Sequence, residues 1–181
     1  MSIARLFFHF YRCGIGGLLI IAFGAMATLL VSAHAAEVTP SPLSPSTDHS
    51  LTLKMVIGHD NHWLSLADIE STPLYDVEMQ HPEGLEGRFT GVWLDTFLEH
   101  QGIQPEDRVR LIARDDYSVF LSADERQKTR YLLVTRLNGM PLDREQLGPL
   151  LLVAPKDAEA VLAGTLPQAR WIWAIQEVRH Q

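Results

Sequence analysis

The sequence has little cysteine: Cys13, near its start, is the only one. The rest of the chain therefore forms no internal disulfide and offers no thiolate as a nucleophile or metal ligand. The sequence also has no run of basic residues, no glycine-rich phosphate-binding loop and no internal repeat. These absences argue against nucleic-acid binding, against nucleotide-dependent chemistry of the P-loop type and against a repeat architecture.

The first 35 residues have the pattern of a secretory signal peptide. Arg5 and Arg12 provide positive charge without any acid, an apolar segment runs from 14 to 31, and Ala33-His34-Ala35 fits the small-x-small cleavage rule. We predict cleavage after Ala35 and export to the periplasm. The apolar segment is longer than usual in signal peptides, so an uncleaved membrane anchor is the alternative.

The next stretch, residues 36–50, contains three prolines and several serines and threonines, and has little to bury. It predicts a flexible linker outside the fold. Residues 51–181 then have the length of one domain with a real core. Two of the 15 basic residues and none of the 22 acidic ones lie in 1–35, so the remainder has a formal charge of −9. This acidity argues further against nucleic acid as a partner.

Apolar residues in the domain alternate over short stretches that are separated by short helical patterns. Strands are expected at 51–57, 74–79, 108–114, 117–121, 131–137, 150–153 and 170–175, and helices at 66–72, 92–101 and 157–164. The order has no regular βαβ period, which predicts an α+β fold with a mixed β-sheet and short interspersed helices. The expected core comprises Leu53, Met55, Leu94, Phe97, Leu98, Leu111, Val119, Leu133, Leu151 and Trp173.

The stretch from Tyr131 to Pro155 has the clearest local signals. Asn138-Gly139 favours a tight type I′ hairpin turn, and Pro141 should end regular pairing soon after it. Gly148-Pro149 then marks a loop before a wholly apolar run that predicts a buried strand.

The same stretch carries a family resemblance. The pattern R-x-N-G-x-P-L, five residues, then G-P-L-x-L-V-x-P resembles the molybdopterin-binding oxidoreductase domain of the sulfite oxidase type. Three further segments agree in order, at 89–103, 115–125 and 169–178, so the resemblance covers most of 51–178. The resemblance implies the sulfite-oxidase-type fold. The sequence is most similar to small, exported, single-domain members of that superfamily.

The resemblance also implies a thiolate ligand, because a cysteine of the family's enzymes binds molybdenum directly. The segment QHPEGLEGR at 80–88, where that cysteine is expected, contains none. Arg5 and Arg12 do not form a twin-arginine pair, so the chain is expected to cross the membrane unfolded and without cofactor. No cofactor and no metal are therefore expected, although the resemblance keeps molybdopterin as the alternative.

Candidate pocket residues are Arg136, Asn138, Tyr117 and Arg114. Arg114 and Arg136 each end a strand-like run at a turn, and arginine suits phosphate, carboxylate and sulfur oxyanions because of its planar charged fork. Tyr117 and Asn138 are implied as pocket neighbours by the family motifs D-D-Y and R-x-N-G. The competing interpretation is that these are surface side chains, with the arginines paired to acids.

Weaker candidates have simpler structural explanations. His59 and His62 lack a third ligand of a metal site and suit a solvated loop. Asp115-Asp116 suits a hairpin turn. Trp171 and Trp173 fall on one face of an expected strand, either packing there or lining a pocket.

Three functions follow as hypotheses. The first is a non-catalytic exported module that binds or senses a small anionic or pterin-like ligand, with no catalytic residue assigned. The second is a molybdopterin-dependent oxidoreductase with an atypical metal ligand. The third is an interaction partner of a membrane-bound sensor or enzyme.

Overall fold

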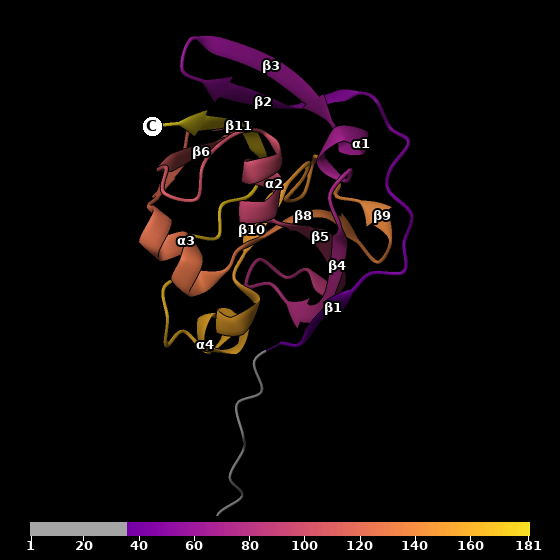
Figure 1. The fold of residues 1–181 in the computed structure, drawn as a ribbon. Helices are drawn as coiled ribbons and strands as arrows, with labels where there is room; N and C mark the ends of the chain where they lie inside the picture. Colours follow the sequence, from indigo (N-terminus) through magenta and orange to yellow (C-terminus); the bar gives the residue numbers. More distant parts are fainter. Residues whose placement is uncertain (1–35) are drawn as a thin grey trace, which may run out of the picture. The chain divides into compact units, whose positions relative to one another are not determined.

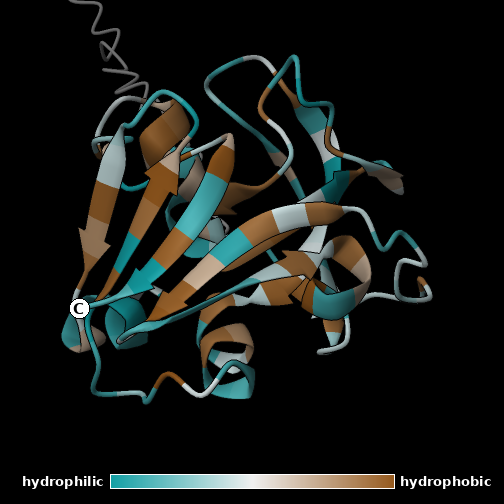
Figure 2. Cartoon of the chain, turned by 90° about the horizontal axis from the view of Figure 1, so that it is seen from above, coloured by the Kyte–Doolittle hydropathy of each residue, from teal (hydrophilic) through white to brown (hydrophobic). Residues whose placement is uncertain are grey.

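The structure is a computed structural model that describes residues 36–181. The signal peptide expected at 1–35 lies outside the described residues, so its predicted cleavage stays a prediction. Within 36–181, no helix is long and apolar enough to cross a membrane. The described residues form an α+β fold with two sheets, shown from two directions in Figures 1 and 2.

The first sheet is antiparallel throughout its strand pairings. Its strand order is β1 (Val38–Pro40), β4 (Leu74–Gln80), β5 (Glu86–Trp93), β8 (Leu132–Leu137) and β10 (Leu151–Val153), with β9 (Met140–Pro141) pairing with β8.

The second sheet is mixed, because β11 pairs parallel to β2 and antiparallel to β6. Its order is β3 (Asp60–Ser65), β2 (Leu51–Ile57), β11 (Ile175–His180), β6 (Val109–Ala113) and β7 (Ser118–Leu121).

The helices are short, as expected for this class. Within the described residues they are α1 (Leu66–Ile69), α2 (Leu94–His100), α3 (Ala123–Thr129), and α4 (Ala158–Leu162), which follows the 3-10 turn η1 (Pro155–Asp157). Ser65 caps α1: its hydroxyl accepts from the Asp68 amide at 3.2 Å, while Asp68 Oδ2 accepts from the Ser65 amide at 2.8 Å.

The hairpin predicted at Asn138-Gly139 is confirmed. Both residues have positive φ, 52° and 81°, as a type I′ turn requires, and Leu137 pairs with Met140 across it. The short strand β9 ends at Pro141, where pairing was expected to stop.

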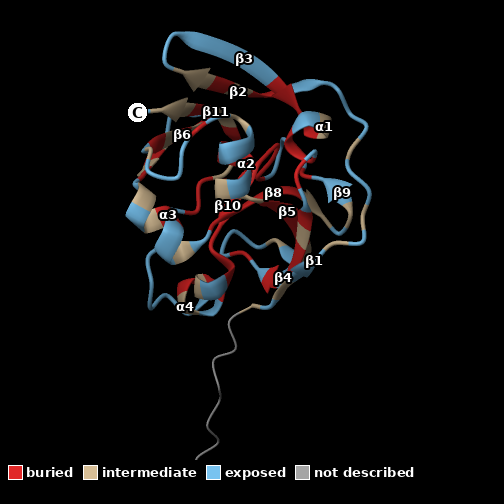
Figure 3. Ribbon diagram, in the orientation of Figure 1, coloured by how far each residue is buried: buried red, intermediate tan, exposed pale blue. Residues whose placement is uncertain are grey.

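The predicted core is buried with one exception. Leu53, Met55, Leu94, Phe97, Leu98, Leu111, Val119, Leu133 and Leu151 are all buried, and Figure 3 shows buried residues running through β2, β5, β8 and β10. Trp173 is only partly buried and packs at the margin of this cluster.

Several element boundaries differ from the predictions. Strand β5 was missed because Gly87 and Gly91 weaken its pattern. Gly91 is needed there: a Cβ at this position would lie 2.2 Å from the Leu133 carbonyl oxygen of neighbouring β8. Helix α2 begins at Leu94, since Val92 and the next residue complete β5.

Strand β3 and helix α3 were also missed, and the last strand was placed too early. It begins at Ile175, not at 170. Ala174 has a positive φ of 52°, which interrupts extended backbone just before β11.

The interpretation of residues 36–50 as a linker outside the fold is wrong. Val38–Pro40 forms edge strand β1 against β4, and the Ser41 amide bonds the Leu74 carbonyl at 2.9 Å. The segment then runs along one side of the molecule to β2 (Figure 1). Prolines are compatible with this path because an edge strand is paired on one side only, so the backbone amides on its other side have no partner in the sheet.

A buried carboxylate holds this segment in place. Glu70, directly after α1, is fully buried and accepts hydrogen bonds from the Thr135 hydroxyl at 2.7 Å and from Arg136 Nε at 2.9 Å. Arg136 Nη2 also binds Glu70 Oε2 in an ion pair. The Ser46 amide donates to the same carboxylate at 2.6 Å, and Arg136 Nη2 donates to the Ser44 carbonyl at 3.1 Å. The cluster thus joins the N-terminal segment, α1 and β8.

We predict that Glu70→Ala lowers the free energy of unfolding by about 3–5 kcal/mol, because it leaves the Arg136 guanidinium without its carboxylate. Urea unfolding measures the change. The matched control is Glu125→Ala, which breaks the more exposed pair with Arg170 and should cost less than about 1 kcal/mol. Equal losses in the two variants would contradict the structural role of Glu70.

Candidate ligand pocket

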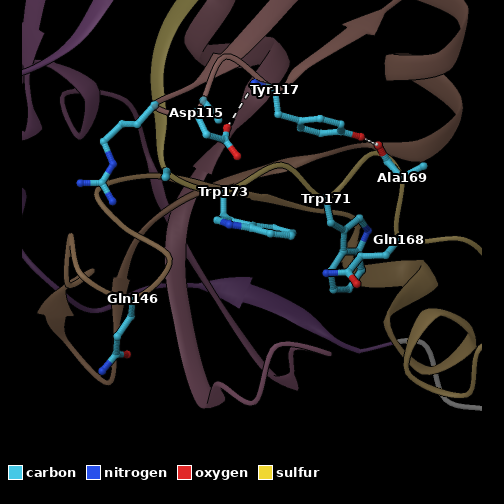
Figure 4. A pocket seen from close by; sticks show the side chains of 10 residues that line it. Asp115, Tyr117, Gln146, Gln168, Ala169, Trp171 and Trp173 are labelled. Carbon is cyan, nitrogen blue, oxygen red and sulfur yellow. Dashed lines mark hydrogen bonds between the residues drawn. The ribbon is translucent and has the colours of Figure 1, made fainter.

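A cavity of about 470 Å³ lies between the β6–β7 turn and the segment that precedes β11. We call it the tryptophan pocket. It is lined by Ala113, Arg114, Asp115, Tyr117, Gln146, Gln168, Ala169, Trp171, Trp173 and Ala174 (Figure 4).

Backbone hydrogen bonds hold the wall of this pocket between the two sheets. The Arg114 amide donates to the Ala174 carbonyl at 3.0 Å, and the Ala174 amide donates to the Leu147 carbonyl at 2.9 Å. Two residues before Ala174, the Ile172 carbonyl accepts from the Leu152 amide of β10 at 2.8 Å. The backbone from 172 to 174 is therefore held by β10, by the loop before β10 and by the β6–β7 turn before it enters β11.

Three aromatic side chains line the pocket. Trp171 is buried, Trp173 is partly buried, and Tyr117 is 51% exposed. Figure 4 shows both indoles and the Tyr117 hydroxyl, which donates to the Ala169 carbonyl at 3.1 Å. Such rings offer flat apolar faces to a ligand.

Polar groups from three loops complete the lining. Arg114 Nη2 donates to the Arg144 carbonyl at 2.5 Å, and Asp115 Oδ1 accepts from the Tyr117 amide at 3.1 Å. Gln168 Nε2 is buried and has no hydrogen-bond partner among residues 36–181. One arginine and one aspartate make the lining close to neutral, and the amides add donors and acceptors.

A buried histidine lies behind the tryptophans. The ring centroid of His81 is 5.4 Å from that of Trp171 and 6.2 Å from that of Trp173. Its Nδ1 accepts from the Glu83 amide at 3.1 Å, so the neutral ring carries its proton on Nε2. Burial lowers the pKa of His81 from 6.5 to about 4, because the charged ring would lose its hydration.

The structure divides the four predicted pocket residues into two pairs. Arg114 and Tyr117 line the tryptophan pocket. Arg136 does not: its side chain binds the buried Glu70, and that hydrogen bond raises the pKa of Arg136. Asn138 does not line it either, because its side-chain oxygen accepts from the Arg88 amide at 3.0 Å and holds the edge of β5.

The expected convergence of Arg136 and Asn138 with Tyr117 around one cavity is therefore not observed. Arg136, at the end of a strand near a turn, forms an ion pair with Glu70. This agrees with the competing interpretation, in which the arginines are paired to acids. Sequence reasoning missed Gln146 and Gln168 as lining residues, and explained Asp115 by its turn alone. The only sequence signal for Gln146 was its position in the five-residue spacer of the family pattern.

The lining does not fit molybdenum ligation of the kind that the family resemblance implies. It offers amides, one carboxylate and one guanidinium, but no thiolate, and the described residues contain no group of three or more metal-ligating side chains. No redox step at a metal therefore follows from these residues. His59 and His62 lie exposed at the β2–β3 hairpin, outside the pocket.

Comparison with known proteins shows the fold and nothing finer. No family profile matches the sequence, and no curated protein sequence matches it. The structure is similar to the crystal structure of the sulfane dehydrogenase SoxCD from Paracoccus pantotrophus, with a TM-score of 0.52 and 11% sequence identity. The similarity covers 92% of this chain and 56% of that chain, so this chain spans little more than half its length. The predicted α+β, sulfite-oxidase-type fold is confirmed by this match.

We predict that His81 makes the protein less stable as pH falls from 6.5 to 4. The folded-state pKa, about 4, lies below the unfolded value of 6.5, so the unfolded chain binds the proton first. The contribution is zero above pH 6.5, grows to a loss of roughly 3 kcal/mol at pH 4, and is constant below it. Urea unfolding across this range should show the slope in the wild type and in His59→Gln, but not in His81→Phe.

Carboxylates act mainly at the acid end of this range and below it. Hydrogen bonds from Ser65 lower the pKa of Asp68 below 3.8, and the pKa of Glu177 lies below 4.5, so both groups lose their contribution as pH falls toward and through these values. A wild-type slope between pH 6.5 and 4 that persists in His81→Phe would assign the effect to another group.

Proposed function

We propose that this chain is a small-molecule-binding module of the sulfite-oxidase-type fold, and that its ligand occupies the tryptophan pocket. The observation that carries the proposal is the composition of this cavity: two indoles and a phenol form its walls, and a few polar groups are placed around them. Its volume, about 470 Å³, lies in the usual range for small-molecule sites.

The lining selects a class of ligand. Flat aromatic walls favour a planar ring system, and the unpartnered Gln168 amide favours an acceptor on the edge of that ring. Because Arg114 and Asp115 balance in charge, the pocket suits a heteroaromatic ligand with both donors and acceptors, such as a pterin, better than a bare oxyanion. The proposed role is binding or sensing without catalysis.

We predict that Trp173→Leu weakens binding of a pterin about tenfold, which corresponds to about 1.4 kcal/mol. The measurement is calorimetric titration of the chain against a panel of pterins and sulfur and phosphorus oxyanions, with tryptophan fluorescence as a second signal. Trp63→Phe is the matched control, since Trp63 lies on β3 outside the pocket and is 48% exposed.

Arg114→Lys adds a second test. It keeps the charge but removes the planar fork, so it should weaken any ligand that the guanidinium binds through two hydrogen bonds. Binding that is unchanged in both Trp173→Leu and Arg114→Lys would remove the tryptophan pocket as the site. Failure of every panel member to bind the wild type would contradict the proposed ligand class.

The proposal includes export by the segment 1–35. We predict that the exported protein begins at Ala36, with an intact mass that lacks the first 35 residues, because Ala33-His34-Ala35 fits the small-x-small cleavage rule. Ala35→Arg should block processing and leave the precursor in the membrane fraction, whereas Ala36→Ser should not. A wild-type protein that keeps residues 1–35 would establish the membrane anchor instead.

A further inference from the structure

The second sheet has one face that no helix of residues 36–181 covers. Cross-strand pairing places two rows of side chains on this face, which we call the open face. One row is Trp63, Lys54, Glu177, Ile112 and Ser118. The neighbouring row is Asn61, Val56, Arg179, Arg110 and Phe120. Figure 2 looks onto the strands from above and shows hydrophobic and hydrophilic residues interspersed along them.

Burial alternates along β6 and β7 in step with the pairing. On β6, for example, Leu111 is fully buried while Arg110 and Ile112 are partly exposed. Every member of the two rows is partly or fully exposed. The opposite face, with Leu53, Met55 and their neighbours, packs into the core. The open face therefore presents apolar and charged side chains to solvent together.

The charge of the open face is opposite to that of the chain. It carries Lys54, Arg110 and Arg179 against the single acid Glu177, and Arg108 lies beside it. Residues 36–181 have a formal charge of −9. A positive patch is thus concentrated on a strongly acidic domain, where it attracts anionic groups at short range.

Glu177 neutralises only part of this patch. It pairs with Lys54 at 3.3 Å and with Arg179, and these two contacts lower the pKa of Glu177 despite its burial. Arg108 and Arg110 make no ion pair with any residue of 36–181. Their guanidinium carbons instead lie 4.7 Å and 5.1 Å from the centre of the Phe120 ring.

A hydrogen bond to a neighbour on the open face also holds Arg110 in position. Its Nη2 donates to the Ser118 hydroxyl at 3.0 Å, and its buried Nε has no partner within the described residues. Both guanidinium groups are therefore ordered on an aromatic ring and retain donors for an outside acceptor. Arginine and tryptophan are the residues most enriched where protein partners bind tightly.

We propose that the open face docks a protein partner whose surface carries carboxylates spaced between apolar side chains. The inference is independent of the tryptophan pocket. Carboxylates would reach Arg108 and Arg110, while apolar side chains would cover Val56, Ile112 and Trp63. A symmetric contact with a second copy is disfavoured, since it would set the cations of one face against those of the other.

Nucleic acid and anionic lipid fit less well. Both present dense negative charge, which the rest of this acidic chain repels, and neither needs the apolar side chains between the cations. An acidic protein surface would contact both the cations and the apolar side chains of the open face.

The experiment measures binding of a fluorescent synthetic peptide that alternates glutamate and valine to the purified chain, by anisotropy, at two ionic strengths. Wild type should bind, and added salt should weaken binding. The double variant Arg108→Glu/Arg110→Glu should weaken it more than tenfold. The matched control, Lys128→Glu/Lys156→Glu, makes the same charge change on exposed lysines elsewhere and should stay within twofold of the wild type.

Additional measurements keep the test independent of folding. Urea unfolding confirms that both double variants fold, and Arg108→Gln/Arg110→Gln should weaken binding without reversing charge. A photo-crosslinking residue at Phe120 should form an adduct with the peptide, whereas one at the exposed Leu162 should not. No wild-type binding, or equal losses in the two double variants, would overturn the proposal.

Two control ligands and a test of self-association separate other occupants. A single-stranded oligonucleotide or vesicles containing phosphatidylglycerol that bind as tightly as the peptide would overturn the proposal in favour of a general anion-binding face. Concentration-dependent dimerisation that Arg108→Glu/Arg110→Glu abolishes would overturn it in favour of a self-interface.

Discussion

One buried carboxylate joins parts of the chain that are far apart in sequence. Glu70 accepts hydrogen bonds from residues of the N-terminal segment and of β8, more than 60 residues later. A buried carboxylate is tolerated only when cations and donors surround it, so these elements must be assembled together. Because β8 lies between β5 and β10, this requirement also fixes the position of an interior strand of the first sheet.

The tryptophan pocket depends on a different constraint, which is the passage of the chain from one sheet to the other. The backbone from 172 to 174 is bonded to β10 and the loop before it on one side and to the β6–β7 turn on the other. Backbone fixed from both sides gives rigid walls, so the indoles are placed before any ligand arrives. Binding sites with such rigid support lose less entropy when they bind.

The sequence was sufficient to predict features that depend on residues close together in the chain. Asn138-Gly139 predicted its turn because only a few residue types adopt positive φ easily, and the alternation of apolar residues predicted most core positions. It was insufficient where the structure depends on distant partners. Nothing near Arg136 in the sequence identifies Glu70 as its partner, so an arginine at the end of a strand was read as a ligand group. The glycines of β5 likewise make sense only beside β8, where a side chain would collide with backbone.

The position of β11 has a consequence for the order of folding. This C-terminal strand is inserted between β2 and β6. Lys54 therefore pairs with Glu177, although almost the whole sequence of the domain lies between these two residues. Contacts between such distant residues form slowly, because a long loop must close before they stabilise anything. Until β11 arrives, β2 and β6 each keep an unpaired edge that other chains can pair with. A chain that emerges from its N-terminus, on a ribosome or across a membrane, must therefore protect these two edges until its last strand is available.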